Sequence, residues 1–344
     1  MGTKIAVGDA RQQLRVIRTE SINCCVTSPP YWLLRDYHGG AAEIGREPTF
    51  RQYIENLLGV IDEIERVLMP HGTLFLNLGD SYITRSGNSR GAYYPETGML
   101  RNVANGEVHV KSRELPHKSL CLIPYRVAIA MQDRGWIVRN VVIWHKPDSM
   151  PESARDRFTV DFEPVLFCTK NPQYYFRQQF RPYVGNNMRR SSSPTKPATK
   201  PAKNLTVPGR TTHGLHIARA NGLGRDVFNS AGANERCVWK ISTARYSGAH
   251  FAVFPDRLAE ICIQAGCPPG GVVLDPFLGS GTVAVVAERL GRRCIGIELN
   301  PEFVQVAKER ILKARAAKNT SVDRSAACET PIRAKDSVEV ELPE

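Results

Sequence analysis

Residues 26–32 read Val-Thr-Ser-Pro-Pro-Tyr-Trp and carry side chains suited to chemistry on a planar ring. Ser28 offers a hydroxyl, and the two prolines present backbone carbonyls without a local N–H that competes for them. Tyr31 adds an aromatic face on which a flat ring can stack. Hydrogen-bond acceptors beside such a face suit a nucleobase that is turned out of its stack and carries an exocyclic amino group. Taken alone, a Pro-Pro-aromatic sequence also fits an ordinary turn.

A second pattern lies near the other end of the chain. It begins with a strand at 272–274 and the glycine turn Asp275-Pro276-Phe277-Leu278-Gly279-Ser280-Gly281-Thr282. A helix at 283–290 follows, and then a strand at 293–297 that ends at the acid Glu298. Such a unit holds adenosine-containing cofactors, because glycines let the ligand approach the backbone and the acid accepts ribose hydroxyls. The spacing of Gly279, Gly281 and Ala284 also fits a dinucleotide fingerprint, so this motif alone would suit a nicotinamide enzyme. Its position near the C-terminal end of the chain and the earlier Ser-Pro-Pro-Tyr corner argue against that reading.

Together the two patterns resemble the amino-group DNA methyltransferases, whose catalytic motif is Asp/Asn/Ser-Pro-Pro-aromatic. The Thr-Ser-Pro-Pro-Tyr form is similar to the cytosine-N4 branch, and the glycine turn is similar to the family's S-adenosylmethionine motif. The order, with the catalytic motif first, resembles the circularly permuted β group. The resemblance covers most of residues 1–314 and weakens within 84–118 and 171–236. It implies a Rossmann-like α/β methyltransferase fold, with a mostly parallel sheet, helices on both faces and a small irregular basic insert.

The resemblance implies roles for the residues of the Pro-Pro corner. The Ser28 hydroxyl and the Pro29 carbonyl would each accept one N–H of the target amine, which is mainly positioning and electrostatics. Tyr31 would stack on the flipped base through its ring and not through its hydroxyl. Asp80, at the end of the next strand, would either orient Ser28 or cap the following turn. The expected catalytic residues are Ser28, Pro29, Pro30, Tyr31 and Asp80.

By the same resemblance, the S-adenosylmethionine pocket draws on three parts of the chain. Asp9 would lie near the adenine, and residues 250–255 would line the adenosine and methionine pocket. The expected cofactor-binding residues are Asp9, Phe254, Pro255, Asp275, Phe277, Gly279, Gly281, Thr282 and Glu298.

The positive charge of the chain is concentrated in one segment. The 344 residues carry a net charge of +12, and residues 181–240 hold eleven Lys or Arg against two acids. A local surplus of this size predicts a polyanion partner, here double-stranded DNA. The candidate DNA-binding residues are Arg181, Arg189, Arg190, Lys196, Lys200 and Lys203. The alternative is a disordered Pro/Ser-rich linker.

Cysteine usage and hydropathy indicate where the protein is located and whether it binds a metal or a membrane. Nine cysteines occur without a C-x-x-C pair, which favours reduced thiols in a cytosolic protein. No spacing suits zinc, and no apolar run is long enough for a bilayer, so neither a metal nor a membrane is expected. We expect a cytoplasmic protein of bacterial, archaeal or phage origin. A cognate restriction endonuclease and the choice between monomer and homodimer stay open.

Strands and helices alternate around both patterns. Strands are expected at 4–7, 21–26, 73–78, 136–144, 160–169, 272–274 and 293–297. Helices are expected from Thr49 to a stop at Pro70-His71-Gly72, at 120–132, 283–290 and 301–316, and after Pro255. A helix between two strands implies a right-handed parallel crossover. Both patterns should then meet at the carboxyl ends of the strands, where open α/β sheets bind ligands.

The expected organisation has four parts. Residues 1–170 form the catalytic half of the methyltransferase domain, 171–237 a target-recognition insert, 238–316 the cofactor-binding half, and 317–344 a disordered tail. Within the first part, residues 84–118 have no periodicity and are expected to form a mobile loop over the site.

Three alternatives to cytosine-N4 methylation of DNA follow from the same residues. The first is adenine-N6 methylation by the same corner, although a carboxamide or carboxylate is usual at the position of Ser28 in those enzymes. The second is a methyltransferase that acts on RNA. The third is a DNA-binding protein without catalytic activity, against which the intact Ser28, Tyr31, Gly279, Gly281 and Glu298 argue.

Overall fold

The computed structural model describes residues 2–34, 37, 42–83, 115–152, 154–182, 232–243 and 254–326, together with the short strands 92–94, 99–101 and 108–109. For residues 317–326 it describes the backbone. The chain divides into two compact units, Met1–Phe176 with Val238–Glu344, and Arg177–Cys237. Tyr174 and Phe176 still belong to the first unit, because both rings pack on Phe167 of its central sheet.

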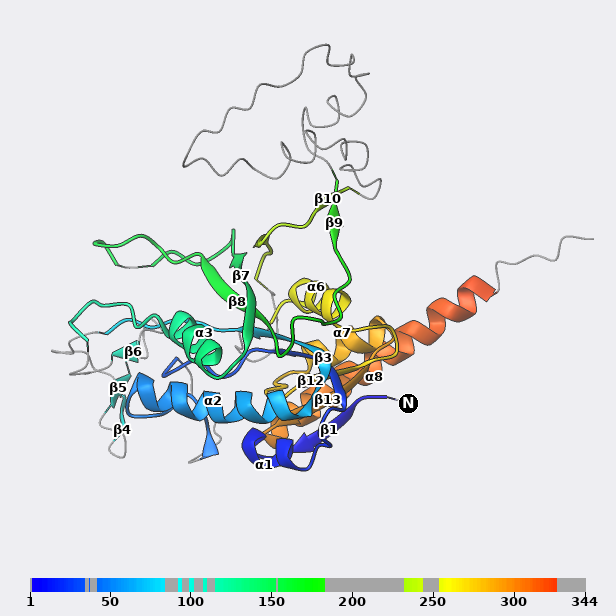
Figure 1. Cartoon of the computed structure of the whole chain (residues 1–344), viewed down its shortest axis with the longest axis horizontal. Helices are drawn as coiled ribbons and strands as arrows, with labels where there is room; N and C mark the ends of the chain where they lie inside the picture. The colour runs from blue at the N-terminus through cyan, green and yellow to red at the C-terminus, as the bar shows by residue number, and fades with distance from the viewer. Residues whose placement is uncertain are drawn as a thin grey trace, which may run out of the picture. The chain divides into compact units, whose positions relative to one another are not determined.

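The first unit is built on an eight-stranded sheet (Figure 1). Its strands lie in the order β1 (Lys4–Val7), β13 (Arg293–Glu298), β12 (Val272–Asp275), β2 (Ile22–Thr27), β3 (Leu68–Asn77), β8 (Phe162–Thr169), β7 (Ile137–His145) and β11 (Val238–Lys240). Only β8 among them runs antiparallel to its neighbours. The predicted catalytic and cofactor strands, β2 and β12, are direct neighbours in this sheet.

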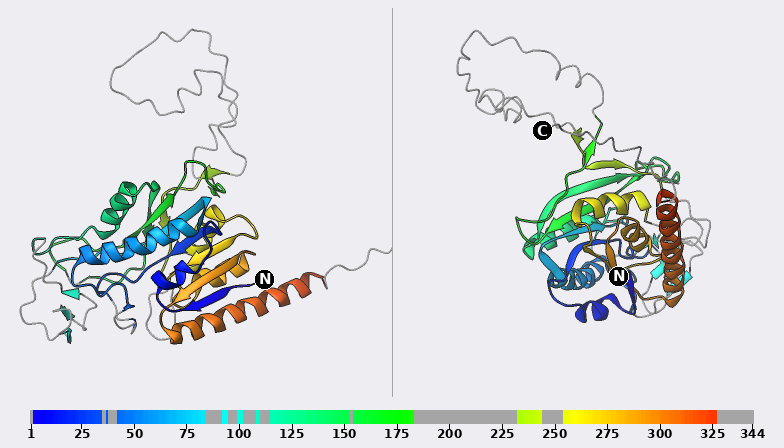
Figure 2. Two further views of the ribbon diagram at one scale, coloured as in Figure 1. Left: turned by 60° about the horizontal axis from the view of Figure 1, so that its bottom comes forward. Right: turned by 90° about the vertical axis from the view of Figure 1, so that its right-hand side faces the viewer.

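Helices cover both faces of the sheet, as predicted (Figures 1 and 2). One face carries α1 (Ala10–Arg15), α2 (Phe50–Val67) and α3 (Ile123–Asp133), and the other carries α6 (Asp256–Gly266), α7 (Thr282–Arg289) and α8 (Pro301–Ala326). Strand β2 alternates between the two cores: Cys25 packs with the first group of helices, and Cys24 and Val26 pack with the second. A strand buried on both faces explains the continuous apolar run that precedes the Pro-Pro corner.

Helix α2 begins as predicted and ends earlier than predicted. The Thr49 hydroxyl caps it by accepting a 3.2 Å hydrogen bond from the Gln52 N–H. The helix stops at Val67, however, and β3 starts at Leu68 and runs through Pro70, so the stop expected at 70–72 is wrong. Proline is tolerated there because the pairing of β3 with β2 is irregular at this end, between Ile22 and Cys24.

Two segments that were predicted to lack regular secondary structure contain strands or helix. Within 84–118, strands β4 (Ala92–Tyr94), β5 (Met99–Arg101) and β6 (Val108–His109) pair into a small antiparallel sheet. Helix α8 continues to Ala326, so the disordered tail predicted from 317 is wrong for residues 317–326. Residues 301–326 contain no glycine, and their one proline is the first helical residue, so nothing stops the helix. Residues 327–344 and the rest of the 84–114 segment lie outside the described residues.

The helices of the described ranges include none that combines the length and the apolar character needed to cross a membrane.

Candidate active site

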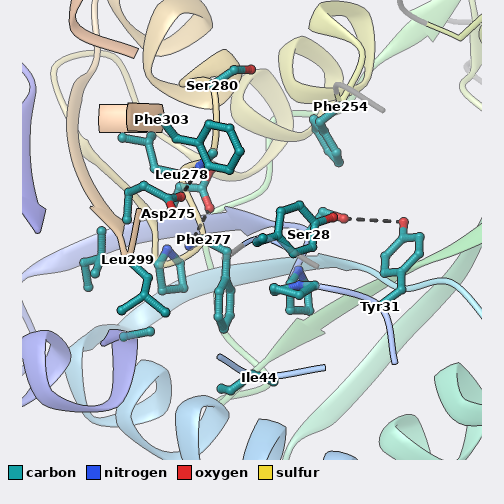
Figure 3. Close-up of a pocket in the computed structure, with 18 of the residues that line it drawn as sticks. Ser28, Tyr31, Ile44, Phe254, Asp275, Phe277, Leu278, Ser280, Leu299 and Phe303 are labelled. Carbon is teal, nitrogen blue, oxygen red and sulfur yellow. Dashed lines mark hydrogen bonds between the residues drawn. The ribbon is translucent and has the colours of Figure 1, made fainter. Parts of the chain in front are cut away.

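A cavity of about 250 Å³ lies where the carboxyl ends of the neighbouring strands β12 and β2 meet. Both sequence patterns contribute to its wall (Figure 3). The predicted site residues that line it are Asp9, Ser28, Pro29, Pro30, Tyr31, Phe254, Asp275, Phe277, Gly279, Thr282 and Glu298. The fold thus brings together residues that are far apart in the sequence.

The Pro-Pro corner is held rigidly by hydrogen bonds from outside it. The Tyr53 hydroxyl donates a 2.9 Å hydrogen bond to the Pro30 carbonyl. The Trp32 indole N–H donates to the Glu47 carbonyl over 2.9 Å, and this side chain is fully buried. Within the described residues, no hydrogen bond engages the Pro29 carbonyl, which therefore remains available as an acceptor at the cavity wall.

The Tyr31 ring lies against the backbone of Gly79. A Cβ atom at position 79 would come within 2.3 Å of Tyr31 Cδ2, so the ring occupies the space that a side chain would need. The Tyr31 hydroxyl donates a 2.6 Å hydrogen bond to Glu163 Oε2. Burial and the neighbouring Glu163 carboxylate raise the pKa of the Tyr31 phenol well above its usual value, so it is a neutral donor. The sequence motifs had predicted no partner for this hydroxyl.

Glu163 anchors a polar cluster that sequence reasoning missed. Its carboxylate accepts a 3.0 Å hydrogen bond from Asn77 Nδ2 and pairs with Lys146 Nζ. Lys146 also lies over the Trp144 ring, 4.7 Å from its centroid, and all four side chains line the cavity. Asn77 ends β3, Lys146 follows β7, and Glu163 lies at the start of β8. Because β8 is antiparallel, its start lies at the same edge of the sheet as the ends of β3 and β7.

Asp80 contacts backbone and not Ser28 in this structure. Its Oδ1 accepts hydrogen bonds from the Ser81 N–H over 2.9 Å and from the Ile123 N–H, the first residue of α3, over 3.1 Å. Burial raises the pKa of Asp80. The described residues that line the cavity do not include it. These contacts favour the capping role that the sequence left open over the orienting role.

The glycine turn of the second pattern is organised around Glu298. Its two carboxylate oxygens accept hydrogen bonds from the Gly279 N–H over 2.7 Å and the Asn300 N–H over 2.9 Å. Gly279 has a φ of +52°, and the nearest atom to a Cβ added there is 4.0 Å away, so its backbone is open to a ligand. Burial raises the pKa of Glu298, while the two N–H groups act in the opposite direction.

Two predicted cofactor-binding residues, Gly281 and Pro255, are not among the described residues that line the cavity. Gly281 faces α8: a Cβ there would lie 2.8 Å from Ala307 Cβ, and its φ is +83°. Its small size therefore serves helix packing. Pro255 is the N-terminal cap residue of α6, and its neighbour Phe254 lines the cavity. The rest of the predicted 250–255 stretch, residues 250–253, lies outside the described residues.

Acidic groups dominate the cofactor side of the cavity, which is lined by Asp9, Glu43, Asp275 and Glu298. Burial raises the pKa of Asp275 to about 7, although a hydrogen bond from Thr27 opposes the shift. Burial alone would raise the pKa of Asp9, but its hydrogen bonds with Arg11 outweigh burial and lower it. Such a wall favours a ligand that carries positive charge.

One of the six predicted DNA-binding residues, Arg181, lies in the described part of the chain. Arg181 belongs to β9 (Phe180–Arg181), which pairs with β10 (Ala233–Asn234) inside the second unit. Arg189, Arg190, Lys196, Lys200 and Lys203 lie outside the described residues. Among the residues that are described, no group of three or more His, Cys, Asp or Glu side chains forms a set of metal ligands.

The sequence matches known proteins along most of its length. Residues 22–309 match the DNA methylase family, N6_N4_Mtase. The chain is 38% identical over 312 residues to the type II methyltransferase M.SmaI of Serratia marcescens, with 91% of each protein covered. It is 37% identical over 329 residues to the type II methyltransferase M.Cfr9I of Citrobacter freundii, which covers 95% of this chain and 92% of that protein. The chain therefore belongs to the DNA methylase family of N6/N4 methyltransferases.

Solved structures share the fold. The PvuII DNA methyltransferase, named as cytosine-N4-specific, matches with a TM-score of 0.56 at 19% identity over 90% of this chain and 86% of that one. A DNA modification methylase of Thermus thermophilus, TTHA0409, complexed with S-adenosyl-L-methionine, matches with a TM-score of 0.53 at 24% identity over 91% and 94% of the two chains. These matches confirm the predicted Rossmann-like methyltransferase fold.

Proposed function

We propose that this chain transfers a methyl group from S-adenosylmethionine to the exocyclic N4 amine of a flipped cytosine in double-stranded DNA. The observation that carries the proposal is that the Ser28 hydroxyl and the Pro29 carbonyl line the same cavity as Gly279 and Glu298. Acceptors for an amine and a turn for an adenosine-containing cofactor thus share one space (Figure 3). Membership of the DNA methylase family supports the reaction class.

The corner acts by positioning the amine. The lone pair of an exocyclic amine is delocalised into its ring and is a poor nucleophile in that state. Ser28 Oγ and the Pro29 carbonyl oxygen each accept one N–H, which draws the nitrogen toward a tetrahedral geometry and directs its lone pair into the cavity. The Tyr31 ring, backed by Gly79, holds the base by stacking.

The residues of the cavity fit S-adenosylmethionine. The Glu298 oxygens each hold one backbone N–H and keep lone pairs for ribose hydroxyls. Phe277 and Phe303 provide apolar rings for the adenine, and the Asp275 carboxyl faces the same cavity as a partner for positive charge. When bound, the cofactor supplies an electrophilic methyl group on a sulfonium, which the acidic wall stabilises.

The choice of cytosine over adenine rests on Ser28. A serine hydroxyl gives one neutral acceptor beside the Pro29 carbonyl, and this form of the corner is similar to the cytosine-N4 branch. Adenine-N6 methylation by the same corner is the second candidate, because adenine presents an amine of the same chemistry.

Double-stranded DNA is the proposed substrate, and the basic segment 181–240 is the proposed surface for its phosphates. Arg181 and the five basic residues from Arg189 to Lys203 carry this role. A cytoplasmic location and a cognate restriction endonuclease are further parts of the proposal, since the relatives are named type II methyltransferases.

The product of the reaction tests the proposal. Unmethylated DNA is incubated with the protein and S-adenosylmethionine, digested to nucleosides and analysed by mass spectrometry. We expect N4-methyldeoxycytidine. N6-methyldeoxyadenosine as the product would replace the proposal with the second candidate, and unmodified DNA under saturating cofactor would contradict both.

A further inference from the structure

Three polar side chains form a chain that leads away from the target amine. Ser28 Oγ donates to the Tyr31 hydroxyl over 3.4 Å, and the Tyr31 hydroxyl donates to Glu163 Oε2 over 2.6 Å. Figure 3 shows the Ser28 and Tyr31 hydroxyls directed toward one another. The first contact is long, as catalytic hydrogen bonds often are before substrate binds.

The hydrogen bonds from Ser28 through Tyr31 to Glu163 all run in one direction. Glu163 is a carboxylate that pairs with Lys146, so the single proton of the Tyr31 hydroxyl points to it. The remaining lone pairs of Tyr31 can only accept, and the single proton of Ser28 points to them. Ser28 therefore offers only lone pairs to the cavity. That polarity suits a substrate that donates an N–H and disfavours one that presents a carbonyl.

Methylation of an amine leaves a proton to be removed. When the nitrogen forms its bond to the methyl carbon, the carbon–sulfur bond breaks with its electron pair on sulfur, and the nitrogen becomes positively charged. The methylated nitrogen still holds two protons, and one must leave to restore the neutral base. Asp275 also lines the cavity, but within the described residues its hydrogen bonds go to Thr27 and the Phe277 N–H and none links it to Ser28.

We propose that Glu163 receives this proton through Tyr31 and Ser28, and so acts as a positioning residue and final proton acceptor for the reaction. The inference rests on the proposed methylation of an amine at Ser28. As the nitrogen gains positive charge during methyl transfer, its N–H proton passes to Ser28 Oγ, the Ser28 proton to the Tyr31 hydroxyl oxygen, and the Tyr31 proton to Glu163 Oε2. The products are a neutral methylated base and a neutral Glu163, while both hydroxyls are restored.

The surroundings of Glu163 fit this task. Its side chain is 15% exposed, and it faces Tyr31 after β2, Asn77 at the end of β3 and Lys146 after β7. Asn77 and Lys146 fix the carboxylate, so that Oε2 stays directed to Tyr31. A fixed acceptor needs no reorganisation at the moment of reaction.

Two variants separate proton acceptance from structure. Glu163→Gln keeps the shape and a carbonyl that accepts from Tyr31, but its amide cannot take the proton. Tyr31→Phe keeps the stacking ring and removes the middle atom of the chain. Tyr53→Phe is the matched control. The Tyr53 hydroxyl donates to the Pro30 carbonyl of the same corner, but it takes no part in the hydrogen-bond chain from Ser28 to Glu163. Single-turnover methyl-transfer rates are measured from acid to neutral pH, and DNA affinity and base flipping, by 2-aminopurine fluorescence, are measured beside them.

We expect both Glu163→Gln and Tyr31→Phe to lower the rate by roughly 10²-fold, with little change in DNA affinity or base flipping. The wild-type rate should fall toward acid pH, because the proton can then no longer leave the amine by this route. This acid limb should disappear in both variants and persist in Tyr53→Phe, and the double variant should be no slower than the slower single one.

A Glu163→Gln enzyme with the wild-type rate and acid limb would overturn the inference. So would a loss of rate that matches a loss of base flipping, since that is a structural effect. If Glu163→Gln does not fold, Tyr31→Phe decides alone by the same criteria. Failure of the proposed function is seen separately, in the nucleoside that the wild-type protein produces.

Discussion

The Thr27 hydroxyl donates a 2.7 Å hydrogen bond to the Asp275 carboxyl, across 248 positions of the chain. Thr27 is the last residue of β2, and Asp275 is the last residue of β12. Both side chains are buried, at 1% and 3% exposure. The hydrogen bond therefore connects the Pro-Pro corner to the glycine turn at the ends of the two strands that precede them. It fixes the distance between the two halves of the site.

Thr27→Val tests the strength of this tie. Valine keeps the β-branched shape but removes the donor, which leaves a buried carboxyl with the Phe277 N–H alone. We expect the free energy of unfolding to fall by about 1–3 kcal/mol in chemical denaturation. Thr73→Val is the matched control, because its buried hydroxyl donates to the neutral carbonyl of Gly266, and it should cost less. A Thr27→Val protein as stable as the wild type would contradict this role.

The raised pKa of Asp275 predicts a pH dependence of stability. In the folded protein the group titrates at about 7, against 3.8 for a free aspartate. Between these values the folded state holds a proton that the unfolded chain has released, so stability decreases as pH rises through this window. The slope from this group is at most about 1.4 kcal/mol per pH unit.

Asp275→Asn removes this titration. Denaturation curves of both proteins are measured between about pH 5 and about pH 8. The wild type should lose stability relative to the variant as the pH rises toward about 7. Above that value the difference should stay constant. A difference that does not change with pH would mean that Asp275 titrates at an ordinary pKa.

Gly79→Ala should disturb Tyr31. A methyl group there would approach the ring to 2.3 Å, so the ring must move from the wall of the cavity. We expect the single-turnover rate to fall by at least about tenfold, or about 1.4 kcal/mol of barrier, with cofactor affinity close to that of the wild type. Gly59→Ala is the control, since no atom lies within 4 Å of a Cβ in this helix, and it should stabilise the protein by roughly 0.5–1 kcal/mol. Equal rates for both variants would exclude a role for the ring position.

Glu298→Ala should weaken cofactor binding. The change removes the proposed ribose acceptor and frees the N–H groups of Gly279 and Asn300. Calorimetric titration with S-adenosylmethionine should show a loss of roughly tenfold or more, or about 1–3 kcal/mol. Glu302→Ala, at an exposed carboxylate in the first turn of α8, should bind as the wild type does. Unchanged affinity in Glu298→Ala would show that the pocket is placed wrongly.

Local motifs account for what the sequence predicted well. The Ser-Pro-Pro-Tyr corner and the glycine turn each lie within a few residues, and each is forced by proline or glycine backbone geometry. Their meeting in one cavity followed from the rule that parallel strands present their carboxyl ends at one edge. Eleven of the predicted site residues line that cavity, and all but Asp9 and Phe254 belong to the two sequence patterns.

The Glu163 cluster was missed because it depends on strand direction. Glu163 lies at the start of an apolar strand, where a local reading places it at the edge opposite to Asn77. Only the reversal of β8 brings the two together, and nothing within residues 162–169 encodes that reversal. The packing of Gly281 against Ala307 was missed for a similar reason, since this contact depends on the docking of α8.

The single-turnover rate of Ser28→Ala tests the central claim most directly. The change removes one acceptor for the amine but leaves the Pro29 carbonyl and the Tyr31 ring in place. The rate of methyl transfer should fall by roughly 10–100-fold, or about 1–3 kcal/mol of barrier, while DNA and cofactor affinities stay near those of the wild type. A Ser28→Ala enzyme that transfers the methyl group at the wild-type rate would contradict the assignment of this corner as the catalytic site.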